Sequence, residues 1–256
     1  MRHFFGAVGL VFGLAAASAV AGQERPPIVA AASDLKFAVT EIAARFEADT
    51  GRRVALNFGS SGNFARQIQQ GAPFELFMSA DEDFVFRLAD AGFTRDCGTL
   101  YAVGRIVLYA PKGSKLALDP ELKGLQAGWG EVRKFAIANP EHAPYGRAAQ
   151  EALRSLKLWE FVQPKLVLGE NIAQTAQFIT TRSAEAGIIA LSLALAPEVA
   201  RQGDHVLLPE TLHNPLRQRM ALTRRAGETA TLFYEYLKQP PARGILKKYG
   251  FLLPGE

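Results

Sequence analysis

The fold class is decided by the stretch Val54-Ala55-Leu56-Asn57-Phe58-Gly59-Ser60-Ser61-Gly62-Asn63. Here a strand expected over 54–58 turns, through two hydroxyl side chains held between glycines, into a helix expected to open near Asn63. Such a turn offers a small anion free backbone N–H groups, hydroxyl donors and the positive end of a helix dipole. Neither Lys nor Arg occurs between Val54 and Ala65. The stretch therefore predicts an anion site built from neutral dipoles, as a carrier that releases its ligand requires.

Strand and helix patterns alternate on both sides of this stretch, which predicts an α/β protein with mainly parallel sheets. Two α/β blocks joined by two long strands, at 104–110 and 218–223, predict two lobes with a two-strand hinge; one continuous sheet is the alternative. Ser79 and Glu82 have capping-box spacing ahead of a helix that ends by Gly92. Other strands are expected over 28–32, 76–79, 134–138, 165–168 and 186–191, and other helices over 35–46, 145–156, 172–180, 230–237 and 244–249.

The first residues have the pattern of a secretory signal peptide. A basic start, Met1-Arg2-His3, precedes an apolar run over 4–20 that ends in small-residue patterns typical of a cleavage site. We expect a signal peptide over 1–21, cleaved after Ala21, and hence export to the periplasm. An uncleaved membrane anchor is the alternative, but the run is short for a membrane span.

Composition excludes several other classes of protein. The chain has 256 residues with a formal net charge of +4, and its charges are mixed along the sequence. No basic block of the kind that binds nucleic acid is present. The single cysteine, Cys97, excludes an internal disulfide, so packing must supply the stability. After the signal peptide, charged residues interrupt every long apolar stretch.

Four expected strand-to-helix turns are alike in chemistry. They lie at 32–34, 59–63, 139–146 and 169–172, and each carries hydroxyl, amide or phenol groups at a helix start. Any one of them alone is explained by helix capping. Ligands of open α/β sheets collect at the carboxyl ends of strands, where all four turns are expected. Four such turns in two blocks therefore favour a shared ligand site.

Several motifs in one order resemble the periplasmic molybdate-binding proteins of ABC transporters, across essentially the whole mature chain. The motifs of the first block and its surroundings are Ala30-Ala31-Ala32-Ser33-Asp34-Leu35, Phe58-Gly59-Ser60-Ser61-Gly62, Ala65-Arg66-Gln67-Ile68, Gly71-Ala72-Pro73 and Phe77-Met78-Ser79-Ala80-Asp81-Glu82. They continue through Ala138-Asn139-Pro140-Glu141-His142-Ala143-Pro144-Tyr145-Gly146, Gly169-Glu170-Asn171-Ile172 and Tyr249-Gly250-Phe251.

The resemblance implies a two-lobed, type II periplasmic binding-protein fold that closes on a tetrahedral oxyanion, molybdate or tungstate. It implies a monomer that delivers the anion to an ABC transporter permease in the inner membrane, with no cofactor and no metal site beyond the bound oxyanion. Lobe 1 would comprise residues 22–107 plus 218–256, and lobe 2 residues 108–217. Carried over by motif, the ligand-binding residues are Ser33, Asp34 and Ser61 from lobe 1, with Tyr145 and the N–H of Ile172 from lobe 2.

Two positions depart from the resembled pattern or sit awkwardly in it. Many members have a ligand-facing tyrosine where this chain has Ala190. One branch of the family instead has its phenol in a Pro-Tyr-Gly turn, as this chain does, and the resemblance to that branch implies that Tyr145 takes the role. The carboxylate of Asp34 would repel a fully deprotonated oxyanion, which only accepts hydrogen bonds. We expect Asp34 to cap its own helix and offer only its N–H. In the alternative it accepts the proton of a ligand such as hydrogen phosphate or arsenate.

Other functions remain as alternatives. Ser60 or Ser61 would be the nucleophile of a hydrolase if a base and an orienting acid stood beside it, but no histidine lies in a recognisable motif with an acid. His142 stands next to the predicted site and would hydrogen-bond Tyr145 or the anion if it is not solvated. A periplasmic sensor module would use the same fold. We expect a carrier and not an enzyme.

Overall fold

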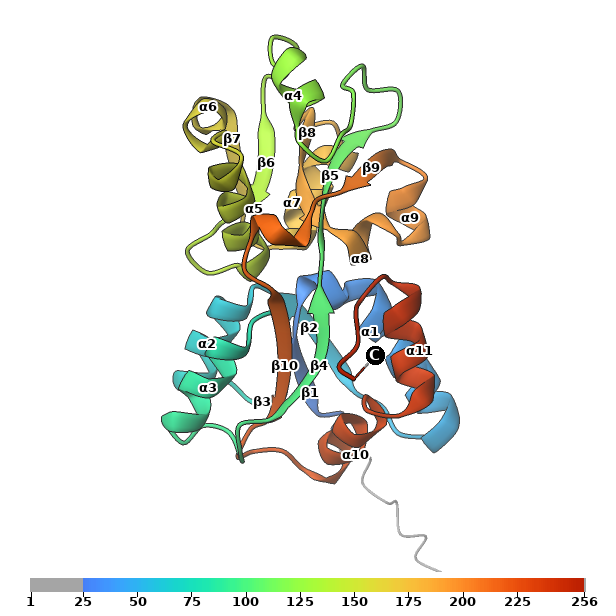
Figure 1. Ribbon diagram of the computed structural model, residues 1–256. Helices are drawn as coiled ribbons and strands as arrows, with labels where there is room; N and C mark the ends of the chain where they lie inside the picture. The colour runs from blue at the N-terminus through green and yellow to red at the C-terminus, as the bar shows by residue number, and fades with distance from the viewer. Residues whose placement is uncertain (1–24, 256) are drawn as a thin grey trace, which may run out of the picture.

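The computed structural model describes residues 25–255 and contains two lobes, one above the other in Figure 1, each built on its own five-stranded sheet. Two sheets confirm the two-lobed α/β prediction and exclude one continuous sheet. The signal peptide expected over 1–21 lies outside the described residues. Among residues 25–255, no helix is long and apolar enough to cross a membrane.

The sheet of the first lobe has the strand order β2-β1-β3-β10-β4. Strands β2, β1 and β3 are parallel, whereas β10 runs antiparallel to both of its neighbours. Helices cover this sheet on both sides, so β1 is almost entirely buried and consists of small and branched apolar residues. The strands are β1 (Ile28–Ala32), β2 (Ala55–Gly59), β3 (Phe74–Ser79), β4 (Thr99–Gly104) and β10 (Leu216–Leu222).

The helices of the first lobe follow the predicted periodicity. The first of them buries Ala38, Val39, Ile42 and Phe46 on one face and stops at Gly51, which has the left-handed φ of 71° that favours glycine. The helical segments are the 3₁₀ turn η1 (Ser33–Leu35), α1 (Lys36–Thr50), α2 (Ser61–Gln69), α3 (Glu82–Asp90), α10 (Glu228–Tyr236) and α11 (Pro240–Lys248).

The second lobe repeats the plan with the strand order β7-β6-β8-β5-β9. Its strands are β5 (Ile106–Pro111), β6 (Phe135–Ala138), β7 (Leu166–Gly169), β8 (Ala186–Ala190) and β9 (Gly203–Leu207). Its helical segments are α4 (Lys123–Ala127), α5 (Pro144–Ser155), α6 (Trp159–Val162), η2 (Gln163–Lys165), α7 (Ile172–Thr180), α8 (Leu191–Ala194), α9 (Pro197–Ala200) and η3 (Glu210–Leu212).

Two connections run between the lobes, from β4 into β5 and from β9 into β10 (Figure 1). The first passes through the single residue Arg105, whose guanidinium donates to the carbonyl of Gly250 at 2.7 and 3.1 Å. The second passes through residues 208–215. The lobe boundaries expected after residues 107 and 217 therefore fall inside β5 and β10, a little beyond the points where the chain changes sheets.

One local prediction, the capping box, was wrong, and two predicted elements are present with shifted ends. The expected strand over 104–110 is β5 alone, and β4 before it belongs to the other sheet. The capping box is absent, because Asp81 caps α3 by accepting from the N–H of Asp83, while Ser79 bonds the backbone of Asp81. Helix α2 begins at Ser61 rather than near Asn63, which places Ser61 in the first helical turn. The remaining predicted elements are present, with ends shifted by at most about one helical turn.

Candidate functional site

A small pocket lies between the two lobes, where the four predicted turns meet. The free space inside it is about 10 Å³, close to what one water molecule needs and far below the roughly 300–1,000 Å³ typical of pockets for organic ligands. It therefore suits one small ion better than a metabolite. The pocket is lined by Ala32, Ser33, Asp34, Gly59, Ser60, Ser61, Ala80, Ala143, Pro144, Tyr145 and Ile172.

All five residues predicted to face the ligand line this pocket, and all five are buried. Ser33, Asp34 and Ser61 come from the first lobe, and Tyr145 and Ile172 come from the second. Groups distant in the sequence thus surround one small volume, and that volume is complete only when the two lobes are together.

Three helices begin at the pocket. Ser61 opens α2, Pro144 opens α5 and Ile172 opens α7, and each of these residues lines the pocket. The N–H groups of a first helical turn have no intrahelical partner, and the helix dipole places partial positive charge there. Since proline lacks an N–H, α5 offers its next amide, that of Tyr145. The three helix starts together favour an anion.

The pocket serines are held in place by backbone N–H groups. The Ser61 hydroxyl accepts from the N–H of Ala80 at 3.0 Å, within the first lobe. The Ser33 hydroxyl accepts from the N–H of Ala173 at 3.2 Å, across the two lobes. A hydroxyl that accepts in this way keeps its own proton to donate. Both serines can therefore donate to an anion.

Asn171 caps α7, as its position in the fourth turn predicts. Its side-chain oxygen accepts from the N–H groups of Ala173 at 3.1 Å and Gln174 at 3.0 Å. The cap consumes the second and third amides of the helix and does not engage the first. Ile172, a residue that lines the pocket, therefore keeps its N–H outside the capping bonds of Asn171.

Gln218, on the connecting strand β10, joins the polar groups behind the pocket, and sequence reasoning missed it. Its buried amide donates to Asp34 Oδ2 at 2.7 Å and to the Tyr145 hydroxyl at 3.0 Å. Its oxygen accepts from the Tyr101 hydroxyl at 2.8 Å. One amide therefore ties a residue of the first lobe to a residue of the second.

The sequence did contain a signal for Gln218. Leu216, Gln218 and Met220 alternate along β10, and all three are buried. A glutamine on the apolar face of a strand must find hydrogen-bond partners, because a buried amide without them is costly. That position marks a polar network, although the sequence does not say which residues form it.

Asp34 does not cap its helix, contrary to our expectation. Residue Leu35 occupies the N-cap position of α1, and neither η1 nor α1 has a side-chain capping bond. The Asp34 carboxylate instead turns toward Gln218, and its second oxygen, Oδ1, has no hydrogen-bond partner among the described residues. Burial raises the pKa of Asp34 to about 6, although hydrogen bonds from Gln218 and Tyr145 oppose the rise.

The two phenols beside Asp34 stay protonated. Burial, reinforced by the charge of Asp34, raises the pKa of both Tyr101 and Tyr145 well above the usual value for tyrosine. The Tyr145 hydroxyl also lies where a Cβ on Gly104 would stand, since such an atom would be 2.1 Å from the phenol oxygen. A glycine at this point on β4 makes room for Tyr145.

The pocket lining contains no basic side chain among the described residues. The same part of the chain holds no cluster of histidine, cysteine, aspartate or glutamate suited to a metal ion. The donors that face the pocket are hydroxyls, a phenol and backbone N–H groups, so the arrangement can hold a small oxyanion by hydrogen bonds alone.

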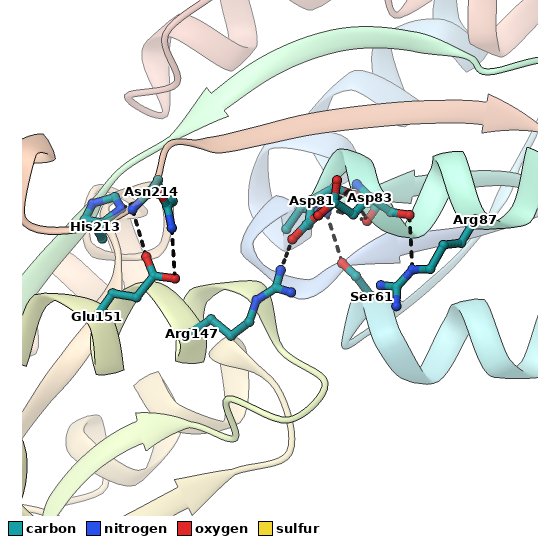
Figure 2. A network of polar contacts seen from close by, with 10 residues as sticks. Ser61, Asp81, Asp83, Arg87, Arg147, Glu151, His213 and Asn214 are labelled. Atoms are coloured by element: carbon teal, nitrogen blue, oxygen red, sulfur yellow. Dashed lines mark hydrogen bonds and ion pairs between the residues drawn. The ribbon is translucent and has the colours of Figure 1, made fainter. Parts of the chain in front are cut away.

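Charged groups lie around the pocket instead. Arg147 of α5 forms an ion pair with Asp81 at the start of α3, which links the two lobes (Figure 2). On another side, the Asn63 amide donates to Glu170, again between the lobes. These contacts form a rim of paired charges and polar groups, which we define as Asn63, Asp81, His142, Arg147 and Glu170.

His142 contacts neither Tyr145 nor the pocket. Its Nδ1 lies 3.1 Å from the Ser60 hydroxyl, and its Nε2 lies 3.5 Å from a carboxylate oxygen of Glu170. The N–H of Gly62 donates to the His142 carbonyl at 2.9 Å. His142 thus holds the second turn, in the first lobe, against the third and fourth turns.

Ser60, His142 and Glu170 have the order of a nucleophile, a base and an acid, but they lack the geometry of a hydrolase. The distance of 3.5 Å from His142 to Glu170 exceeds the roughly 2.6–3.2 Å of an orienting hydrogen bond. The N–H of Gly62, a natural oxyanion donor, is already bonded to His142, and Ser60 is only 4% exposed. The contact is therefore a lobe-to-lobe bond.

Ala190, where many members of the resembled family have tyrosine, ends β8 and is fully buried. It is not among the described residues that line the pocket, whereas Tyr145 is. The phenol of this pocket therefore comes from the start of α5.

Comparison with known proteins places this geometry in a family. Residues 28–252 match the model of the bacterial extracellular solute-binding proteins. The molybdate-binding protein of Azotobacter vinelandii is 36% identical, with 95% of each chain covered, and that of Rhodobacter capsulatus is 35% identical, with 96% of this chain and 94% of its own covered. The solved Azotobacter vinelandii periplasmic molybdate-binding protein superposes with a TM-score of 0.82 at 31% identity, covering 90% of this chain and 100% of its own.

Proposed function

The chain belongs to the bacterial extracellular solute-binding proteins, and on that premise we propose that it captures one tetrahedral oxyanion, molybdate or tungstate, between its two lobes. It then delivers the anion to an ABC transporter permease in the inner membrane. The protein acts in the periplasm as a monomer, without a cofactor and without catalysis.

The observation that carries this proposal is the convergence of three helix starts and two serine hydroxyls, from both lobes, on one small pocket between the lobes. A dianion that enters such a pocket exchanges its water shell for fixed donors. Ser33, Ser61, Tyr145 and the N–H of Ile172 are the donors we assign, and the Tyr145 hydroxyl turns its single proton from Asp34 to the anion when the anion binds. The lobes move about Arg105 and residues 208–215, and closure completes the donor set.

Molybdate and tungstate fit the proposal better than smaller oxyanions. Three relatives that are 32–36% identical to this chain are molybdate-binding proteins. A donor set fixed by two packed lobes holds an anion of one size at normal hydrogen-bond lengths, and a smaller one such as sulfate at stretched lengths. Molybdate and tungstate have the same charge and shape, so both bind.

Calorimetry on the mature, anion-free protein tests this function. At about pH 6 we expect molybdate and tungstate to bind saturably, one per chain, and sulfate, phosphate and arsenate to bind at least about a hundredfold more weakly. Ser61→Ala should weaken molybdate binding, while Ser183→Ala, which alters an exposed serine of the second lobe, should not. Tight binding of phosphate or arsenate without molybdate or tungstate would refute the assignment.

A further inference from the structure

Asp34 supplies the one carboxyl group among the described residues that line the pocket. It is 1% exposed, and its Oδ1 is a buried oxygen without a hydrogen-bond partner in the described part of the chain. Buried polar atoms are nearly always paired, so an orphaned one at a ligand pocket indicates a partner that arrives with the ligand. An oxyanion, however, brings only acceptor oxygens. An ionised Asp34 would repel it.

We propose that Asp34 takes up one proton when the anion binds and donates a hydrogen bond from Oδ1 to it. The inference rests on the proposed function. The proton comes from solvent, one O–H bond forms on Asp34, and the bound dianion keeps its full charge. Asp34 is then a ligand-contacting residue that couples anion capture to proton uptake.

The hydrogen bonds of Gln218 determine which oxygen carries the proton. The Tyr101 hydroxyl lies 2.8 Å from Gln218 Oε1, closer than its other acceptor, the Ser79 carbonyl at 3.2 Å, and Gln218 Nε2 faces Asp34. This amide donates to Oδ2, which must therefore accept. Oδ1 is left as the site of the proton, and it is also the oxygen that lacks any other partner.

The surroundings of Asp34 make the proton available. The titratable groups that face it are the phenols of Tyr101 from β4 and Tyr145 from α5, and both stay neutral because burial raises their pKa. The hydroxyl of Ser192, from α8, donates to the Asp34 carbonyl and carries no charge. Burial already raises the pKa of Asp34 to about 6, and a dianion beside it raises that pKa further.

The expected signature is a pH-dependent affinity. Below about pH 6 the free protein already holds the proton, so molybdate affinity should be flat. Above that pH the affinity should fall by up to about tenfold per pH unit, because each binding event must first recover a proton. Calorimetry in two buffers of different ionisation heat should record uptake of close to one proton per molybdate at about pH 7.5.

Asp34→Asn is the decisive variant, since its amide has the shape of the protonated acid and donates a hydrogen bond without a proton. It should bind molybdate with a pH-independent affinity and without proton uptake, and above about pH 7 it should bind more tightly than the wild type. Asp90→Asn, an exposed carboxyl at the end of α3, should keep the wild-type profile. Difference infrared spectra should show a protonated carboxyl band on molybdate binding that Asp34→Asn lacks.

Two results overturn the inference, and they differ from failure of the proposed function. A flat wild-type pH profile with tight molybdate binding would leave the function standing and exclude a proton on Asp34. If the wild-type protein preferred phosphate or arsenate to molybdate, and Asp34→Asn lost affinity for these anions, the proton would lie on the ligand and not on Asp34. Failure of both molybdate and tungstate to bind at any pH would refute the function itself and the inference with it.

Discussion

The centre and the rim of the contact between the two lobes are built from opposite chemistry. The central pocket is lined by hydroxyls, a phenol, helix-start amides and one carboxyl, with no basic side chain in the described part of the chain. The rim carries charge, as in the pair of Arg147 with Asp81 and the approach of His142 to Glu170. We therefore propose that the centre recognises the anion, whereas the rim holds the lobes together.

Energetics support this division. The rim pairs are partly exposed, since Arg147 is 38% and Glu170 is 56% exposed. Partly exposed ion pairs contribute about 0–1 kcal/mol each. Hydrogen bonds from buried donors to a charged ligand contribute about 1.5–3 kcal/mol each. Substitutions at the centre should therefore alter affinity more than substitutions at the rim.

Gly62→Val should have the largest effect, because it blocks the approach of the lobes beside the pocket. A Cβ at residue 62 would lie 2.8 Å from the carbonyl oxygen of His142 and 3.0 Å from its Cα, and backbone atoms cannot move aside cheaply. We expect molybdate affinity to fall at least about a hundredfold and small-angle scattering to report an open shape even with molybdate. Gly130→Val is the control, because a Cβ added at this glycine would meet no atom within 4 Å. A compact molybdate complex of Gly62→Val would contradict the closed arrangement.

Asp34→Asn should stabilise the anion-free protein at alkaline pH. The pKa of Asp34 is raised from 3.8 to about 6 in the folded state. Its contribution to stability is therefore full below about pH 4 and is lost as the pH rises through about 6, a loss of up to about 3 kcal/mol. Urea unfolding should give the variant an advantage of that order at about pH 8 and almost none at about pH 4. If the variant and the wild type differed in unfolding free energy by the same amount at both pH values, Asp34 would have an ordinary pKa.

Tyr145→Phe should weaken molybdate binding by about 1–3 kcal/mol, the usual effect of losing a hydrogen bond to a charged group. The ring stays, so packing against Gly104 is kept, but Gln218 loses an acceptor. Calorimetry measures the change. Tyr236→Phe, a phenol on the far side of the first lobe that bonds Asp49, should bind molybdate like the wild type, and unchanged affinity in Tyr145→Phe would remove Tyr145 from the site.

Arg147→Met should have the smallest effect. It removes the interlobe ion pair with Asp81 and keeps an apolar stem against the Phe84 ring. We expect the free energy of molybdate binding to weaken by less than about 1 kcal/mol, because a larger fraction of the molecules is open. Small-angle scattering should detect that larger open fraction. Arg217→Met breaks a pair with Glu82 inside the first lobe and should not change closure. A loss from Arg147→Met as large as that from Tyr145→Phe would end the distinction between centre and rim.

The sequence predicted most of the fold because its signals are local. Apolar periodicity located the strands and helices, and the four polar turns located residues that do line one pocket. It failed where a polar side chain has several possible hydrogen-bond partners. Ser79 has the spacing of a capping box, yet Asp81 caps the helix by accepting a hydrogen bond from the N–H of Asp83. Asp34 has a preferred capping side chain, yet it turns to Gln218.

The contacts between lobes were beyond prediction for a physical reason. The bonds of His142 to Ser60 and of Gln218 to Asp34 join residues far apart in the chain, and they depend on how two rigid bodies meet. Helical and strand periodicity carries no information on that meeting. Gln218 could be suspected from its buried position on a strand, but its partners come only from the structure.

The bond from the Gly62 N–H to the His142 carbonyl has a consequence for the rate of exchange. It joins one lobe to the other through backbone atoms beside the pocket. A bound anion therefore escapes only after the lobes separate, and the lifetime of the complex equals the waiting time for that opening. Adding a competing anion cannot hasten release, whereas a membrane partner that pulls the lobes apart can.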